Sequence, residues 1–173
     1  MTHRRAILLV LPAVILGGCS SFQNVTVQNI KQAAADAAAI PAALKRLMPT
    51  IEEIPERDAF GLITYNRFTT IGVLVDEIEG VAAQIDHVPS EQQAPLVDRL
   101  WAGLLMIAML LAPVQGLPIS VIKVLGAALS VLRAIESSLS LPPTPHAGIP
   151  LQFRAGIEMA PAEARNVLAA AGK

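Results

Sequence analysis

An uncharged stretch of 23 residues, 100–122, constrains the structure of this chain more than any other feature. A helix of about 20 apolar residues crosses a lipid bilayer, so the stretch is long enough on count alone. However, Pro113, Gly116 and Pro118 interrupt it, and the apolar part before them, residues 100–112, makes a helix only about 20 Å long. Two helices joined by a tight turn explain these breaks better than one membrane-spanning helix.

The second of these two helices carries polar residues on a narrow edge only. Lys123, Ser130 and Ser137 mark that edge, while the opposite side is aliphatic, which is typical of a helix packed inside a bundle. We therefore expect residues 100–122 to form core and the folded bundle to present no apolar face to lipid. The aliphatic positions are Ile122, Leu125, Leu129, Leu132 and Ile135.

Helices are also predicted on the N-terminal side of this stretch. Residues 29–51 repeat apolar side chains at helical spacing, and Pro41, which lacks an N–H group, should kink this helix or start a second one. Residues 58–86 carry the clearest apolar stripe, with Asp58 as N-cap, and should end at His87-Val88-Pro89. The stripe consists of Ile71, Leu74, Val75, Ile78, Val81, Ala82 and Ile85.

The C-terminal part is predicted to lie outside the bundle. Residues 142–145, Pro-Pro-Thr-Pro, stop any helix and extend the chain. Apolar residues then alternate loosely over 151–159, which indicates an extended flap. A last short helix should cover 161–171, with proline as its first residue and Gly172 after its last. Because prolines detach the flap, truncation after Ser140 is expected to cost little stability.

Composition agrees with an all-α fold. Hydrophobic residues make up 53% of the chain but aromatic residues only 3%, so Leu, Ile, Val and Ala must supply the packing, and these favour helices over sheets. We predict a small bundle of about four to five helices, with an extended N-terminal tether and a Pro-rich C-terminal segment. The expected divisions are 1–18, a signal peptide; 19–28, a tether; 29–141, the bundle; and 142–173, the Pro-rich segment with its short helix.

The N-terminus has the order of an export signal. Arg4 and Arg5 precede an apolar run of 11 residues, 6–16, which is too short to span a bilayer but suits a signal-peptide core. The run leads into Leu16-Gly17-Gly18-Cys19, which contains the only cysteine of the chain. This tetrapeptide resembles the lipobox of bacterial lipoproteins. The two arginines also fit a twin-arginine signal, but the short, strongly apolar core favours the general secretion route.

The resemblance implies a lipid anchor. The thiol of Cys19 would receive a diacylglycerol group, a signal peptidase would cut between Gly18 and Cys19, and the new amino group would be acylated, typically with palmitate. Ser20 after the cysteine implies the outer membrane, where an aspartate would favour the inner one. The implied partner is membrane lipid, bound through acylated Cys19. The alternative is that Cys19 is a small buried hydrophobic residue in a short N-terminal helix.

Charge excludes a nucleic-acid footprint. The 13 basic and 14 acidic residues become 11 and 14 once Arg4 and Arg5 are removed with the signal, a net charge of −3. Residues 52–98 hold ten acidic residues against Arg57 and Arg67, a local net charge of −8. We interpret this as a solvated acidic surface, which repels anionic headgroups and nucleic acid alike.

No catalytic or metal-binding pattern stands out. Asp86, His87, Ser90 and Glu91 are close in sequence, but helix capping explains them better than a catalytic triad, because Ser90 and Gln93 have capping-box spacing. His87 and His146 lack metal-ligand spacing, and the acidic group Glu52, Glu53 and Glu56 is typical of a solvated loop. We expect neither an enzyme nor a cofactor.

The sequence thus predicts an outer-membrane lipoprotein that faces the periplasm and has a structural or protein-interaction role, with an envelope protein as a possible partner. Two alternatives stay open. The first is a carrier whose aliphatic interior holds a lipid or another apolar ligand. The second is a membrane-active lipoprotein, of the phage lysis or exclusion type, in which the hairpin of residues 100–135 enters the bilayer.

Leu104 tests whether the uncharged stretch is core. Leu104→Lys should unfold the bundle, because an unpaired buried charge costs several kcal/mol against a total stability of about 5–15 kcal/mol. Circular dichroism of the chain from Gln23 onward measures the loss of helix. We expect the nearby Trp101 to lie in the core as well, rather than at a headgroup interface. An unchanged thermal transition in the variant would contradict a core position.

Overall fold

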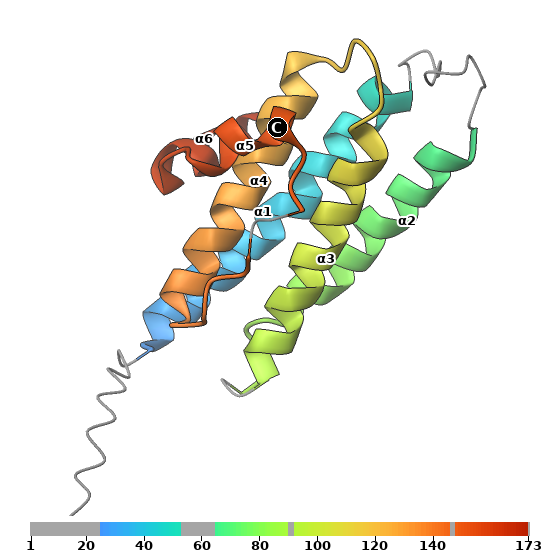
Figure 1. The fold of residues 1–173 in the computed structure, drawn as a ribbon. Helices are drawn as coiled ribbons and strands as arrows, with labels where there is room; N and C mark the ends of the chain where they lie inside the picture. The colour runs from blue at the N-terminus through green and yellow to red at the C-terminus, as the bar shows by residue number, and fades with distance from the viewer. Residues whose placement is uncertain (1–24, 53–64, 90–91, 146–147, 173) are drawn as a thin grey trace, which may run out of the picture.

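The computed structural model describes residues 25–52, 65–89, 92–145 and 148–172, and this part of the chain is all α-helical, as predicted (Figure 1). Its helices are α1 (Val27–Glu52), α2 (Tyr65–Ala82), α3 (Gln93–Leu111), α4 (Ile119–Ser138), α5 (Leu151–Ile157) and α6 (Pro161–Ala171).

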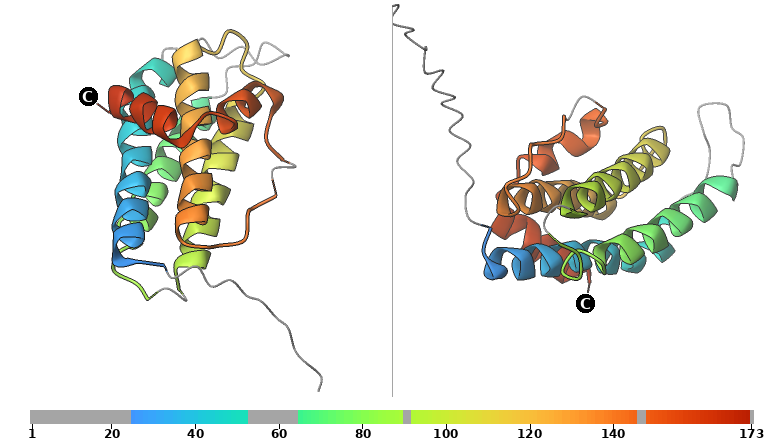
Figure 2. Two further views of the ribbon diagram at one scale, coloured as in Figure 1. Left: turned by 90° about the vertical axis from the view of Figure 1, so that its left-hand side faces the viewer. Right: turned by 90° about the horizontal axis from the view of Figure 1, so that it is seen from below.

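The four longest helices form an up-and-down bundle (Figure 2). α1 and α3 each pack against α2 and α4, so the four helices make a closed ring in which α1 and α3 are diagonal. The connections 83–92 and 112–118 are short, so the helices that they join run antiparallel. α5 and α6 lie outside the ring: α5 packs on α4, and α6 packs on both α4 and α1.

Aliphatic side chains fill the centre of the ring. On α1, α2 and α3 the buried residues recur every three or four positions, which places them on one side, whereas α4 is buried on nearly all sides. Leu104 is fully buried, as predicted, whereas Met106 is 48% exposed, so Met106→Lys is a matched control for Leu104→Lys. The largest fully buried side chains include Trp101, Phe153, Ile40, Leu44, Ile71, Ile78, Leu100 and Ile107.

α1 is one continuous helix. It runs through Pro41 and Pro49, so of the two sequence-based alternatives a second helix does not start at Pro41, which is itself buried. α1 also begins two residues earlier than predicted, because Thr26 caps it: the backbone N–H of Asn29 donates to Thr26 Oγ1 at 3.2 Å. The end of the expected tether therefore joins the helix, and Val25 packs against the core.

α2 ends at Ala82, earlier than the predicted His87-Val88-Pro89. Turns replace the helix from Ala83 onward, and the N–H of Ile85 donates to the carbonyl oxygen of Ala82, three residues back. Ile85 still lies in the core with the rest of the predicted stripe, except for Leu74, which is half-buried. The predicted N-cap, Asp58, lies outside the described residues.

The predicted break in the uncharged stretch is confirmed. α3 ends at Leu111 and α4 begins at Ile119, and the turn between them contains Gly116 with a φ of 73°. Glycine is suited to this backbone conformation because it has no Cβ atom.

The prediction of an extended flap after residue 150 is wrong. Residues 151–157 form α5, and Phe153 and Ile157, four residues apart, are buried in the core. Leu151, which suggested the strand-like alternation, is 77% exposed. Truncation after Ser140 would therefore remove core, contrary to the sequence-based expectation. The terminal helix α6 has the predicted bounds and ends at Gly172.

α5 crosses α4 at a contact between two glycines. A Cβ atom added to Gly126 in α4 would lie 2.6 Å from the Cα atom of Gly156 in α5, and one added to Gly156 would lie 2.2 Å from that of Gly126. Both distances are shorter than any real carbon–carbon contact, so neither position tolerates a side chain at this separation. The two glycines allow the backbones to touch.

The outer side of α3 is not covered by the described residues. α5 and α6 both pack on α4, and neither has its main packing on α2 or α3. α3 is also the one described helix that is long and apolar enough to cross a membrane by length and composition, and 44% of that part of it is buried in the bundle. The expectation that the bundle offers no apolar face is therefore wrong, because Met106 and Met109 are 48% and 57% exposed.

Gly126→Ala should destabilise the protein by about 1–3 kcal/mol, because the new methyl group forces α5 away from α4. Gly80→Ala is the matched control: Gly80 lies in α2 with open space around it, so alanine should stabilise the helix by up to about 1 kcal/mol. Urea unfolding of the two variants measures both effects. Equal effects of the same sign would contradict the packing assigned to Gly126.

Candidate functional site

The structure brings together few of the residues that the sequence singled out. Gly18 and Cys19 lie outside the described residues, so the cleavage and lipidation site stays a prediction. Asp86 and His87 are exposed in the turn after α2, with 2.6 Å between Asp86 Oδ1 and His87 Nδ1. The serine and glutamate of that cluster lie outside the described residues, so the structure does not place the four residues relative to one another.

A metal centre is not formed by the described ranges: they contain no group of three His, Asp or Glu side chains that could hold an ion. Glu52 is exposed at the end of α1, while Glu53, Glu56 and His146 lie outside these ranges.

The acidic side chains of α2 pair with cations on neighbouring helices. Lys45 Nζ of α1 lies 2.6 Å from Glu79 Oε2 and 3.2 Å from Asp76 Oδ1, and Arg99 of α3 lies 3.1 Å from Glu77. The hydrogen bond to Glu79, and then that to Asp76, raises the pKa of Lys45. These side chains are all exposed, so the pairs orient the helices and add little stability.

Four buried polar side chains occur in the described part of the chain: Asp36, Gln93, Ser130 and Glu136. Each has a hydrogen-bond partner within the protein, as buried polar groups require. Gln93 Nε2 donates to the backbone oxygen of Ile85 at 3.3 Å, which ties the start of α3 to the turn after α2. Ser90, the partner of Gln93 in the predicted capping box, lies outside the described residues.

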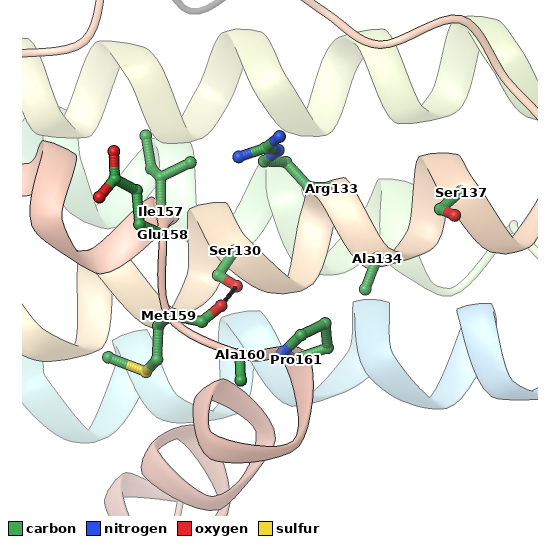
Figure 3. Close-up of a pocket in the computed structure, with 9 residues that line it drawn as sticks. All are labelled: Ser130, Arg133, Ala134, Ser137, Ile157, Glu158, Met159, Ala160 and Pro161. Atoms are coloured by element: carbon green, nitrogen blue, oxygen red, sulfur yellow. Dashed lines mark hydrogen bonds between the residues drawn. The ribbon is translucent and has the colours of Figure 1, made fainter.

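Ser130 lies beside an open groove of about 340 Å³ between α4 and the segment that joins α5 to α6 (Figure 3). Its hydroxyl donates to the backbone oxygen of Met159 at 2.8 Å. Arg133 and Glu158, both exposed, are the charged residues that line the groove. Because the Ser130 hydroxyl already has an acceptor, the groove does not present an activated nucleophile.

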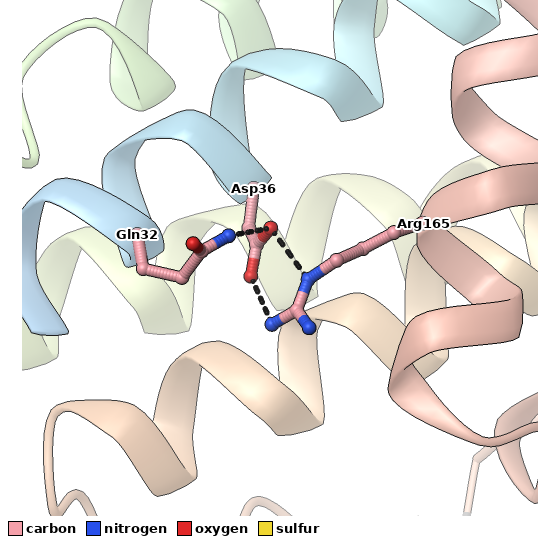
Figure 4. A network of polar contacts seen from close by, with 3 residues as sticks. All are labelled: Gln32, Asp36 and Arg165. Atoms are coloured by element: carbon pink, nitrogen blue, oxygen red, sulfur yellow. Dashed lines mark hydrogen bonds and ion pairs between the residues drawn. The ribbon is translucent and has the colours of Figure 1, made fainter.

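Asp36 and Arg165 join α1 to α6 (Figure 4). Arg165 Nε donates to Asp36 Oδ1 and Arg165 Nη2 donates to Asp36 Oδ2, each at 2.8 Å, and Gln32 Nε2 donates to Asp36 Oδ1 at 2.9 Å. The guanidinium group therefore contacts both carboxylate oxygens, which is the strongest geometry for such a pair. The side chain of Asp36 is only 4% exposed, so α6 supplies the charge that compensates for its burial.

The hydrogen bonds with Asp36 raise the pKa of Arg165 above its usual range, against the opposing effect of burial. Arg165 thus stays charged over the whole range of pH in which proteins fold. Both carboxylate oxygens of Asp36 accept hydrogen bonds from an arginine that stays charged. This geometry suits a structural ion pair rather than a group that transfers protons.

Glu136 fixes the chain after α4. Its Oε1 accepts hydrogen bonds from Trp101 Nε1 at 2.6 Å, from the backbone N–H of Thr144 at 3.0 Å, and from the Thr144 hydroxyl. Ser140 has a φ of 53°, and Leu141 N–H donates to the backbone oxygen of Glu136 at 2.8 Å, so the chain reverses at the end of α4. Trp101 is thus a core residue, as expected, with its polar atom satisfied by a buried acid.

Sequence analysis did not single out Asp36, Glu136 or Arg165. A signal for Glu136 exists, because it is the only acidic residue between Asp98 and Glu158 and lies in an otherwise aliphatic helix. Asp36 interrupts an alanine-rich run in a similar way. A lone acid among apolar residues predicts a buried, paired carboxylate, but its partner 129 residues away has no local signal.

A second, smaller groove of about 190 Å³ lies between α2 and α3 on their uncovered side. Its lining is mostly apolar and includes Leu74, Val81, Gly103 and Met106, and the paired Glu77 and Arg99 are its charged residues. Met109, one turn further along α3 from Met106, is also exposed. The groove offers binding contacts and no reacting group.

Comparison with protein-family models, with curated proteins and with solved structures finds no match for this chain.

Arg165→Met should lower the free energy of unfolding by about 3 kcal/mol, because it leaves the buried Asp36 carboxylate without a cation. Arg99→Met is the matched control, since it removes an exposed ion pair of α3 and should change stability by less than about 1 kcal/mol. Urea unfolding of both variants measures the difference. If the two substitutions lower the free energy of unfolding equally, the ion pair with Asp36 is not what stabilises the packing of α6 on α1.

Proposed function

We propose that this chain is a lipid-anchored protein of the bacterial cell envelope. Acylated Cys19 holds it at the periplasmic face of the outer membrane, where the helical bundle has a structural or protein-interaction role. The observation that carries the proposal is Leu16-Gly17-Gly18-Cys19, which follows a charged and then apolar N-terminus and resembles a lipobox. Ser20 supports the outer membrane over the inner one.

The start of α1 supports a short connection between lipid and bundle. α1 begins at Val27, so seven residues, 20–26, separate it from Cys19. Such a segment reaches at most about 25 Å when fully extended. The anchor thus keeps the bundle within about one bundle width of the lipid, as a protein that contacts other envelope components at the membrane surface requires.

The polar groups of the described residues support binding or structure rather than catalysis. Asp36, Gln93, Ser130 and Glu136 each hold two segments of the chain together through a hydrogen bond. The two grooves on the surface of the described residues are open and mostly apolar. Such surfaces bind a partner by burial of apolar area.

A membrane-active role is the second candidate, and the apolar composition of α3 favours it. Insertion of residues 100–135 would have to remove Leu104 from the core and separate Trp101 from Glu136. Alkaline carbonate distinguishes the two candidates when it is applied to vesicles incubated with the chain from Gln23 onward. An inserted hairpin resists this extraction, whereas a folded bundle that only touches the lipid is released.

Cys19→Ser should abolish incorporation of radioactive palmitate and lipoprotein-type cleavage, because it removes the acylated thiol. Ser20→Asp is the matched control: it should keep the label but move the protein to the inner-membrane fraction of an enteric host on a sucrose gradient. Label that persists in Cys19→Ser would show that the anchor is assigned to the wrong residue. An unlabelled wild-type chain would disprove the proposed anchor altogether.

A further inference from the structure

We infer that the outer face of α3 rests on the lipid surface to which the chain is anchored. This face consists of Ala102, Met106, Met109 and Pro113, which are exposed and follow one another at helical spacing on the side away from the bundle centre. The inference rests on the proposed lipid anchor and adds to it the side of the protein that meets the membrane.

The coverage of the bundle is one-sided. α4 is enclosed, because α1 and α3 flank it in the ring and α5 and α6 pack on its outside. Among the described helices α3 has only its two ring neighbours as main contacts, so no described helix covers its outer face. Leu74 and Val81 of the neighbouring α2 line the groove beside this face and extend its apolar surface.

The exposed side of α3 is as apolar as its buried side. No charged residue occurs between Arg99 and Lys123, and every residue from Ala102 to Val114 is apolar or glycine. A helix that is apolar all round is normally covered on all sides, in a protein core or by lipid. The described chain covers one side of α3, which leaves the other side for a different apolar phase.

Lipid fits this face better than a second protein surface does. Protein interfaces carry about one hydrogen bond per 100–200 Å², and these polar contacts fix how the partners align. From Ala102 to Pro113 the outer face has no side-chain donor or acceptor that could fix such an alignment. Contact with acyl chains needs no hydrogen-bond donor or acceptor, and the flexible side chains of Met106 and Met109 adapt to a fluid surface.

The charges around the face agree with this orientation. Glu77 of α2 lines the groove beside this face and pairs with Arg99, and Asp98 is exposed in the first turns of α3. Lys123 is exposed in the first turns of α4, beyond the other end. The described acid that lines the groove beside this face is thus paired, and a cation lies beyond the end of the face.

The anchor reaches far enough to permit this contact. Neighbouring helices in a bundle lie about 10 Å apart, which puts the outer surface of α3 within about 20 Å of the axis of the diagonal helix α1. Residues 20–26 span up to about 25 Å from the start of α1. With the helices parallel to the membrane, the acyl chains and the outer face of α3 enter the same leaflet.

Site-specific quenching tests the inference on the full acylated chain. Acylation occupies the thiol of Cys19, the only native cysteine, so Met106→Cys, Met109→Cys and Ala38→Cys each create a single free thiol for a nitrobenzoxadiazole fluorophore. Ala38 is the matched control, because it is exposed on α1, diagonal to α3. The labelled proteins are placed in vesicles of phosphatidylethanolamine and phosphatidylglycerol, with or without nitroxide-labelled lipid.

Nitroxide lipid should remove about half or more of the emission at positions 106 and 109 and leave position 38 nearly unchanged, because only the outer face of α3 meets acyl chains. Equal quenching at the three positions would overturn the inference. A blue shift at 106 and 109 without quenching would also overturn it, since a protein would then cover the face. Flotation of the same samples separates the two proposals: chains that do not float lack the proposed anchor, whereas floating chains without selective quenching refute the face alone.

Discussion

The contact between Gly126 and Gly156 sets the distance at which the C-terminal segment packs on the bundle, and much of the structure depends on it. Because neither residue has a Cβ atom, the backbones of α4 and α5 touch. This approach puts Phe153 and Ile157 into the core and brings the carbonyl oxygen of Met159 to the hydroxyl of Ser130. A segment that begins with several prolines thus becomes part of the hydrophobic core rather than a loose cover.

Two buried carboxylates hold the C-terminal segment in its register. Glu136 fixes the chain directly after α4 through Trp101 and Thr144, and Asp36 fixes α6 through the guanidinium group of Arg165. A buried acid is costly without its donors, so a shifted position of the segment would leave a charge unpaired in the core. The glycine contact therefore allows α5 to pack closely on α4, and the two buried acids fix the position of the segment along the bundle.

The attachment of α5 and α6 also gives the bundle two different sides. α4 is surrounded by α1, α3, α5 and α6, and its buried side chains point in nearly every direction. Along the outer side of α3 the described chain leaves side chains exposed, and Met106 and Met109 mark this open side. Under the proposed lipid anchor, lipid would cover this side, and the side that carries α5 and α6 would face the periplasm.

The sequence by itself determined the parts of this protein that depend on local signals. Proline and glycine placed the break between α3 and α4 and the bounds of α6, and the apolar period placed the buried stripe of α2. The tertiary structure alone decided that α5 is a helix, that Asp36 is buried against Arg165 and that one side of α3 stays open. The physical reason is range: a turn residue or an apolar stripe acts within a few positions, whereas the partner of Asp36 is 129 residues away and becomes a partner only when α6 packs on α1.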